Sequence, residues 1–149
     1  MRRLLILCRA ISTVPVSGVG HGVVVFNSAT PYAGTSIKRM RWRFERGKTH
    51  ILRRRWFNQK GQGEWSAATG DKDKVAYLTL GFNPKAQAGF TMNNIVSRAV
   101  TLGLGGNEGV GGKNKSGFYF EHTLTGATVR AGGTVLIKDG QLLLQKQPK

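Results

Sequence analysis

The chain has 149 residues, and its 23 Lys and Arg residues against 7 Asp and Glu residues give a formal net charge of +16. This length favours one domain over residues 1–149, and 40% hydrophobic residues are enough to form a core, which excludes a purely basic tail. The apolar runs are too short for a membrane-spanning helix, and the single cysteine, Cys8, excludes an internal disulfide or a cysteine-rich zinc site. So large a positive charge favours a polyanionic partner, most often a nucleic acid.

The 21 glycines and the scarcity of helix-length periodic segments predict a β-rich α+β domain, with mostly antiparallel short strands and one or two short helices. At the N-terminus, residues 1–12 carry three arginines and no acid around the apolar stretch 4–8. Mitochondrial presequences share this composition, and a first β-strand with basic flanks fits it equally well. Residues 1–10 are therefore either a targeting segment or a strand.

The next segments lead into the most basic part of the chain. Residues 22–27 form a short apolar run that predicts a buried strand, and residues 28–34 a loop. Residues 38–60 then hold ten Lys and Arg residues. Within them, Met40, Trp42 and Phe44 alternate with arginines, a period of two that places apolar and basic side chains on opposite faces of a strand.

We therefore predict a hairpin in this basic region, with a turn at residues 46–48 and a partner strand over residues 49–57. One face would be aromatic and belong to the core, and the other would be rich in guanidinium groups. A plain solvated face, selected for solubility, is the alternative interpretation, although solubility alone normally mixes both charge signs.

The remaining elements are predicted in chain order. Residues 58–74 are polar and contain glycine, so we expect an exposed connection there. Met92 to Ala99 is the best candidate for a short helix, and the adjacent Asp139 and Gly140 are a strong hairpin signal. Strands are predicted at residues 75–80, 100–104, 118–121, 128–130, 134–138 and 141–144, with a glycine-rich loop at residues 103–112.

The residues by themselves predict no catalytic site. Gly112-Lys113 does not complete a phosphate-binding loop, because Asn107 and Asn114 stand where glycine and Ser or Thr are required. No two histidines have metal-ligand spacing, and the neighbours Glu121 and His122 would point to opposite faces of a strand. Serine-nucleophile signatures are also absent.

Four stretches taken in order resemble the C-terminal domain of the thermophilic metallo-aminopeptidase family, of the aminopeptidase T and aminopeptidase S type. The resemblance runs from about residue 5 to residue 140, and it implies that a family N-terminal domain has no counterpart here. The stretches are Ser12-Thr13-Val14-Pro15 with residues 22–26, the strand pair around residues 43–48, Leu80-Gly81-Phe82-Asn83-Pro84, and residues 102–107 with 111–116.

The resemblance implies a two-metal peptidase scaffold whose ligands are lost. Carried over by position, the family's ligands fall at Ala10, Tyr77, Thr101, Tyr119 and Glu121, of which only Glu121 keeps a carboxylate. A register shifted by one residue would instead make His122 a displaced ligand. Two cations held about 4 Å apart need several anionic or imidazole ligands to offset their repulsion. We therefore expect no metal, no other cofactor and no catalysis.

A lost active site together with this charge predicts a non-catalytic RNA-binding subunit of a large ribonucleoprotein. We expect a ribosome-like assembly containing rRNA and neighbouring proteins, mitochondrial or cytoplasmic, without a membrane; the resemblance also allows a homodimer. Two alternatives stay open: a metal-dependent aminopeptidase fragment or subunit, and a module that docks an acidic protein. The predicted RNA contacts are Lys38, Arg39, Arg41, Arg43, Arg53, Arg54, Arg55, Lys60, Lys113 and Lys115.

Overall fold

The computed structural model describes residues 4–7, 10–13, 21–26, 30–32, 35–37, 40–51, 59–89, 93–131 and 134–143. Its largest element is a five-stranded sheet in which every neighbouring pair is antiparallel. The strand order is β1 (Leu4–Leu7), β2 (Ala10–Thr13), β8 (Val75–Gly81), β9 (Ala99–Gly105) and β10 (Tyr119–Thr125). The N-terminal segment thus contains the predicted strand, within a β1–β2 hairpin at the edge of this sheet.

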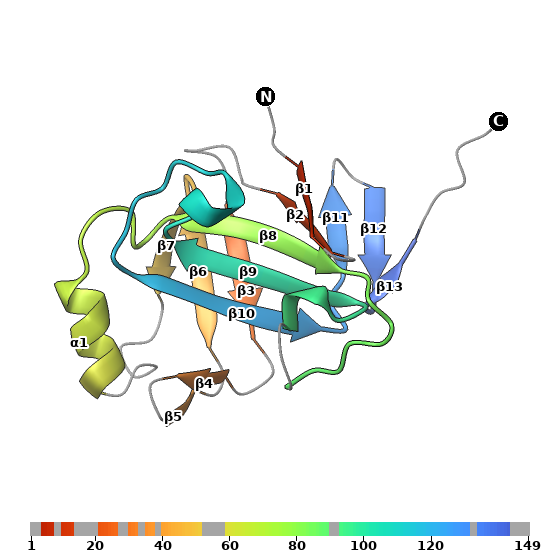
Figure 1. Ribbon diagram of the computed structural model, residues 1–149, viewed down its shortest axis with the longest axis horizontal. Helices are drawn as coiled ribbons and strands as arrows, with labels where there is room; N and C mark the ends of the chain where they lie inside the picture. The colour runs from red at the N-terminus through yellow and green to blue at the C-terminus, as the bar shows by residue number, and fades with distance from the viewer. Residues whose placement is uncertain are drawn as a thin grey trace.

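The remaining described strands form three smaller antiparallel sheets. In Figure 1, the strands of the β3–β6–β7 sheet cross behind β8, β9 and β10, so the two sheets form layers. The first small sheet contains β3 (Gly22–Val25), β6 (Arg41–Glu45) and β7 (Lys48–Ile51); the second contains β11 (Val129–Ala131), β12 (Thr134–Lys138) and β13 (Gln141–Leu142); the third pairs β4 (Thr30–Tyr32) with β5 (Thr35–Ile37). The prediction of a sheet-rich domain with few short helices is confirmed.

The core lies between the five-stranded sheet and the β3–β6–β7 sheet. Trp42 is fully buried there, with its ring centroid 4.5 Å from that of Phe26 and 5.7 Å from that of Phe120, both in edge-on contact. Buried Met40 and Phe44 join the same cluster, together with Leu102, Leu104 and Phe118. Burying such aromatic side chains removes a large apolar area from water, which holds the two layers together.

Two hairpin turns are confirmed where the sequence predicts them. Arg46 and Gly47 have φ of 52° and 72°, and Asp139 and Gly140 have φ of 49° and 76°. Two consecutive residues with positive φ are typical of the type I′ turn, whose twist matches that of the flanking strands. The first turn joins β6 to β7 and the second joins β12 to β13.

Helix α1 (Gln59–Ala67) lies within residues 58–74, where the sequence predicts an exposed connection. It sits at one end of the molecule (Figure 1), and its Trp65 packs edge-on against Phe118 with centroids 4.8 Å apart. Lys72 Nζ donates hydrogen bonds to the carbonyls of Trp65, at 2.7 Å, and Ala68, at 2.9 Å. These contacts fix a segment that has little helix signal of its own.

The other helical elements are short 3-10 turns, η1 (Asn93–Ile95) and η2 (Glu108–Val110). The first falls within the predicted helix at residues 92–99, where Ala99 already begins β9. None of the helices in the described ranges is long and apolar enough to cross a membrane.

Strand β3 differs from its prediction as a buried strand. Val23 is 46% exposed and Val25 is 58% exposed, although both belong to the apolar run. The strand lies at the edge of its three-stranded sheet, and only one face of that sheet meets the core. The apolar run at residues 22–27 therefore forms the predicted strand, but the strand is not buried on both faces.

Candidate functional site

Strand β6 has one basic face and one aromatic face, as its sequence predicts. Arg41 and Arg43 are exposed, whereas the alternating Trp42 and Phe44 are buried in the core. Since successive side chains of a strand point to opposite faces, the core that fixes the two aromatic rings also turns both guanidinium groups to the outside.

The neighbouring strands extend this outer surface, which we call the basic face. Val25 pairs with Arg41, while Val23 and His50 pair with Arg43 from the two sides of β6. Residues directly opposite each other in an antiparallel pair lie on the same face of the sheet. The exposed valines therefore lie beside the arginines, and the basic face combines cationic and apolar surface.

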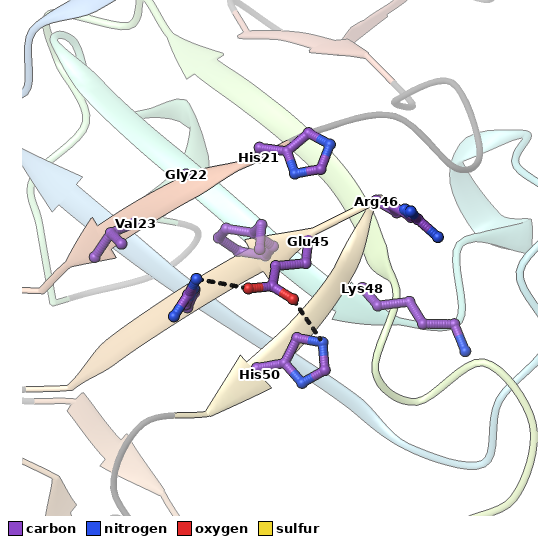
Figure 2. A pocket seen from close by; sticks show the side chains of 9 residues that line it. His21, Gly22, Val23, Glu45, Arg46, Lys48 and His50 are labelled. Atoms are coloured by element: carbon purple, nitrogen blue, oxygen red, sulfur yellow. Dashed lines mark ion pairs between the residues drawn. The ribbon is translucent and has the colours of Figure 1, made fainter.

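A depression of about 780 Å³ opens at one end of the basic face, close to the β6–β7 turn (Figure 2). Glu45 stands within it, with Oε1 2.8 Å from Arg43 Nη2 and Oε2 3.8 Å from His50 Nε2. All three side chains are about half exposed, so water screens the Arg43–Glu45 ion pair and the longer His50 contact, and both interactions are weak. Their main effect is to hold Arg43 and His50 toward one carboxylate.

Two further cations at the depression are not held by Glu45. In Figure 2 the side chains of Arg46 and Lys48 extend away from that carboxylate. Lys48 Nζ lies 3.9 Å from Asp73 Oδ2, at the outer limit of an ion pair. Among the described residues, the lining of the depression thus contains Arg43, Arg46 and Lys48 against Glu45, a clear excess of positive charge.

The other predicted contacts divide into two groups. Lys113 and Lys115 are exposed on the glycine-rich loop, and Lys115 Nζ lies 4.0 Å from Glu108 Oε1. Lys38, Arg39 and Arg53 to Arg55 lie outside the described residues, and of Lys60 only the backbone, within α1, is described. The structure therefore joins Arg41 and Arg43 on one face and adds Arg46 and Lys48, which the sequence interpretation left out.

The glycine-rich loop is held by two asparagines. Buried Asn107 donates from Nδ2 to the carbonyl of Ala76, at 2.8 Å, and accepts on Oδ1 from the backbone N–H of Asn114, at 2.7 Å. Asn114 in turn donates to the carbonyl of Val75, at 3.0 Å. These bonds tie the loop to β8, and a Cβ atom at Gly105 or Gly112 would collide with Phe118 or Asn107, so these two glycines permit the close packing.

The positions at which the resemblance implies metal ligands lie together on the opposite side of the molecule. Register places Tyr77, Gly103 and Glu121 in one row across β8, β9 and β10, and Thr79, Thr101 and Thr123 in the next. Both rows lie on the far face of the five-stranded sheet, because the alternating Leu102, Leu104 and Phe120 point to the core. All five positions implied by the resemblance therefore share one face, because Ala10 pairs with Gly81, which lies two residues beyond Thr79 in β8.

Two phenols and a carboxylate form a hydrogen-bonded group on this far face. Tyr119 Oη donates to Glu121 Oε2 at 2.6 Å, and Tyr77 Oη donates to the same oxygen. The two hydroxyls also lie within hydrogen-bond distance of each other, and the rings are stacked, with centroids 6.3 Å apart and planes at 24°. Burial, with the added effect of the Glu121 charge, raises the pKa of both tyrosines, so both phenols keep their protons at neutral pH.

Next to this group is a second depression, of about 580 Å³, which we call the tyrosine cavity. Its lining includes Tyr77, Tyr119 and Glu121 together with Asn94, Asn107 and Glu108 from the segments around η1 and η2. Within the described residues, no group of three or more His, Cys, Asp or Glu residues could hold a metal ion. Asn94 and Asn107 carry no recognisable motif, and only the fold brings them to this face.

His122 does not belong to this cavity. It pairs with Leu102 and packs edge-on against Phe26, with ring centroids 4.4 Å apart, on the core side of the sheet. Burial lowers the pKa of His122 to about 4, so the imidazole is neutral at physiological pH. The interpretation of His122 as a displaced metal ligand is therefore wrong, since it points away from the other ligand positions.

No protein-family model matches the chain, and no curated protein matches it either. Among solved structures, that of 2,5-dihydroxypyridine dioxygenase from Pseudomonas putida KT2440 superimposes with a TM-score of 0.68 at 14% sequence identity. The match covers 92% of this chain and 44% of the dioxygenase chain, so this chain spans less than half the length of that protein. What the two share at this identity is the fold: the chain is similar in architecture to one part of a dioxygenase.

Proposed function

We propose that this chain is a non-catalytic RNA-binding subunit of a large ribonucleoprotein, and that the basic face contacts the sugar–phosphate backbone. The observation that carries the proposal is the alternation in β6, which anchors Trp42 and Phe44 in the core and presents Arg41 and Arg43 to solvent. A rigid strand presents cations at fixed spacing, which lowers the entropic cost of meeting a regular row of phosphates.

The residue types suit a phosphate backbone better than a protein surface of mixed charge. A guanidinium group meets a phosphate with two parallel hydrogen bonds and can also stack on a base. The exposed Val23 and Val25 add apolar contact beside the arginines, and Arg46 and Lys48 extend the positive surface around the turn. The depression is a concave surface against which a folded RNA could pack, and proteins recognise such RNAs by their shape and backbone.

The salt dependence of binding tests this proposal. We expect the affinity for a structured RNA to fall steeply as NaCl rises, because each phosphate that the protein neutralises releases counterions. The double variant Arg41→Gln, Arg43→Gln should lower the slope of log K against log [salt] by about 1 to 2, because each phosphate that is no longer neutralised lowers it by about 0.7 to 0.9. The matched control Lys85→Gln, Lys138→Gln removes two exposed charges outside the basic face and should leave most of the slope intact.

Two results would contradict the proposal. An affinity that does not change with salt, or equal decreases in the test and control variants, would mean that the basic face does not contact phosphate. Pull-down from an extract with and without nuclease tests the protein-docking alternative. An acidic protein partner retained after RNA is removed would favour a protein-docking role.

A further inference from the structure

The tyrosine cavity has a charge opposite to that of the rest of the molecule. Among the described residues, its lining holds two of the chain's seven carboxylates, Glu108 and Glu121, and no Lys, Arg or His. Lys115 lies near it, 4.0 Å from Glu108, but both of these side chains are largely exposed. In a chain of net charge +16, a concave surface whose described charged groups are both acids favours the entry of a cation.

The cavity also has acceptors that receive no hydrogen bond from the described residues. Both tyrosine hydroxyls donate to Glu121 Oε2, which leaves Oε1 of the same carboxylate without a donor in the described part of the chain. Asn94 Oδ1 is buried and has no hydrogen-bond partner there either. A buried acceptor without a donor destabilises the fold, so a ligand that supplies donors would recover part of that free energy.

The aromatic part of the lining also favours a cationic ligand. Tyr77 is 5% exposed and forms the inner wall, whereas Tyr119 is 50% exposed and stands at the opening. Their stacked rings offer a π face to a cation, and desolvated cations bind such faces most strongly. The bonds to Glu121 fix the two rings before any ligand arrives, which reduces the entropy lost on binding.

We infer that the tyrosine cavity binds a small organic cation that carries a primary ammonium group. Such a group has three donors and no acceptor, which matches an unpaired carboxylate oxygen, an unpaired amide oxygen and an aromatic wall. Its alkyl chain would lie along Val110 and the glycines of the η2 segment. The inference is independent of the RNA-binding proposal, because this cavity and the basic face lie on opposite sides of the two-sheet core.

Titration of the full chain with n-butylammonium chloride, followed by amide NMR at constant ionic strength, tests the inference. We expect saturable shifts at residues 94 and 119–121, and none with the same concentration of butan-1-ol. Glu121→Gln should weaken binding by about tenfold or more, because it removes the charge but keeps an acceptor for both phenols. The control Glu64→Gln neutralises a carboxylate on α1 outside the cavity lining and should bind as the unaltered chain does.

A gain-of-function variant keeps the test independent of folding effects in Glu121→Gln. Asn94→Asp replaces the unpaired amide with a third carboxylate in the cavity lining and should tighten binding severalfold. Equal binding of butanol, or unchanged affinity in both Glu121→Gln and Asn94→Asp, would overturn the inference. Saturable binding of Mn²⁺ at these residues, with no response to butylammonium, would also overturn it, because the site would then select an inorganic ion.

Discussion

The ring of Tyr77 lies against Gly103, its cross-strand partner in β9. A Cβ atom at residue 103 would lie 2.6 Å from Tyr77 Cε1 and 2.9 Å from Cδ1, closer than van der Waals contact permits. The absence of a side chain at Gly103 is therefore what lets Tyr77 lie across the sheet and reach Glu121.

Gly103→Ala should displace the Tyr77 ring and destabilise the fold by about 1 to 3 kcal/mol, as other substitutions that overpack a closed site do. Urea denaturation measures the decrease in stability, and tyrosine NMR signals report the ring movement. The control Gly109→Ala places its Cβ in open space and should change the free energy of unfolding by less than about 0.5 kcal/mol.

Asn107→Ala removes the side chain that ties the glycine-rich loop to β8. It leaves the carbonyl of Ala76 and the N–H of Asn114 without their partners, so we expect the free energy of unfolding to fall by about 2 to 4 kcal/mol. Asn83→Ala breaks only the exposed bond to the N–H of Lys85 and should cost less than about 1 kcal/mol. Similar decreases in the two variants would mean that Asn107 does not anchor the loop.

His122 should make stability depend on pH. Burial lowers its pKa from the ordinary 6.5 to about 4, so between these values the unfolded chain binds more protons than the folded chain. The contribution is complete above pH 6.5 and is lost as the pH falls toward 4, for a total of about 3 kcal/mol. Urea midpoints from pH 7.5 to 4.5 measure it, and His122→Gln should show a shallower decline over that range.

Lys72→Met should loosen α1 while leaving the two-sheet core folded. The ammonium group donates to the carbonyls of Trp65, in the last turn of the helix, and Ala68, just beyond it, and lies 5.6 Å from the centre of the Trp65 ring. Its removal should cost about 1 to 2 kcal/mol and speed hydrogen exchange in residues 63–68. Lys85→Met, an exposed lysine outside the helix, should leave those exchange rates unchanged.

Glu45→Gln provides a gain-of-function test of the basic face. The change frees Arg43 from its ion pair. It also removes the negative charge of Glu45, the carboxylate among the described residues that line the depression. RNA affinity at low salt should rise about two- to fivefold, with a steeper salt slope. An unchanged or weaker affinity would mean that Glu45 positions Arg43 for binding.

The elements that follow from sequence are those whose local signals agree with their tertiary surroundings. Alternation from Met40 to Glu45 predicted both the strand and its two faces, and Asp139-Gly140 predicted a turn that needs two positive φ angles. Helix α1 is not predicted, because its sequence contains two glycines and lacks apolar periodicity. The contacts that stabilise it, Trp65 on Phe118 and the hydrogen bonds of Lys72, are tertiary contacts.

The candidate sites could be predicted only in part, for a related reason. Arg41 and Arg43 are near neighbours on one strand, so a period of two was enough to place them together. Tyr77, Thr101 and Glu121 come from three strands, and only their register places them on one face. The unpaired oxygen of Asn94 depends on where η1 packs against the sheet, which no spacing in the sequence reveals.

The two proposed binding surfaces lie on opposite sides of the two-sheet core. The basic face lies on the outside of one layer and the tyrosine cavity on the outside of the other, with the buried Trp42 cluster between them. A polyanion seated on the first surface would leave the second open to solvent. The two proposed ligands would therefore bind independently, because occupying one surface does not block the other.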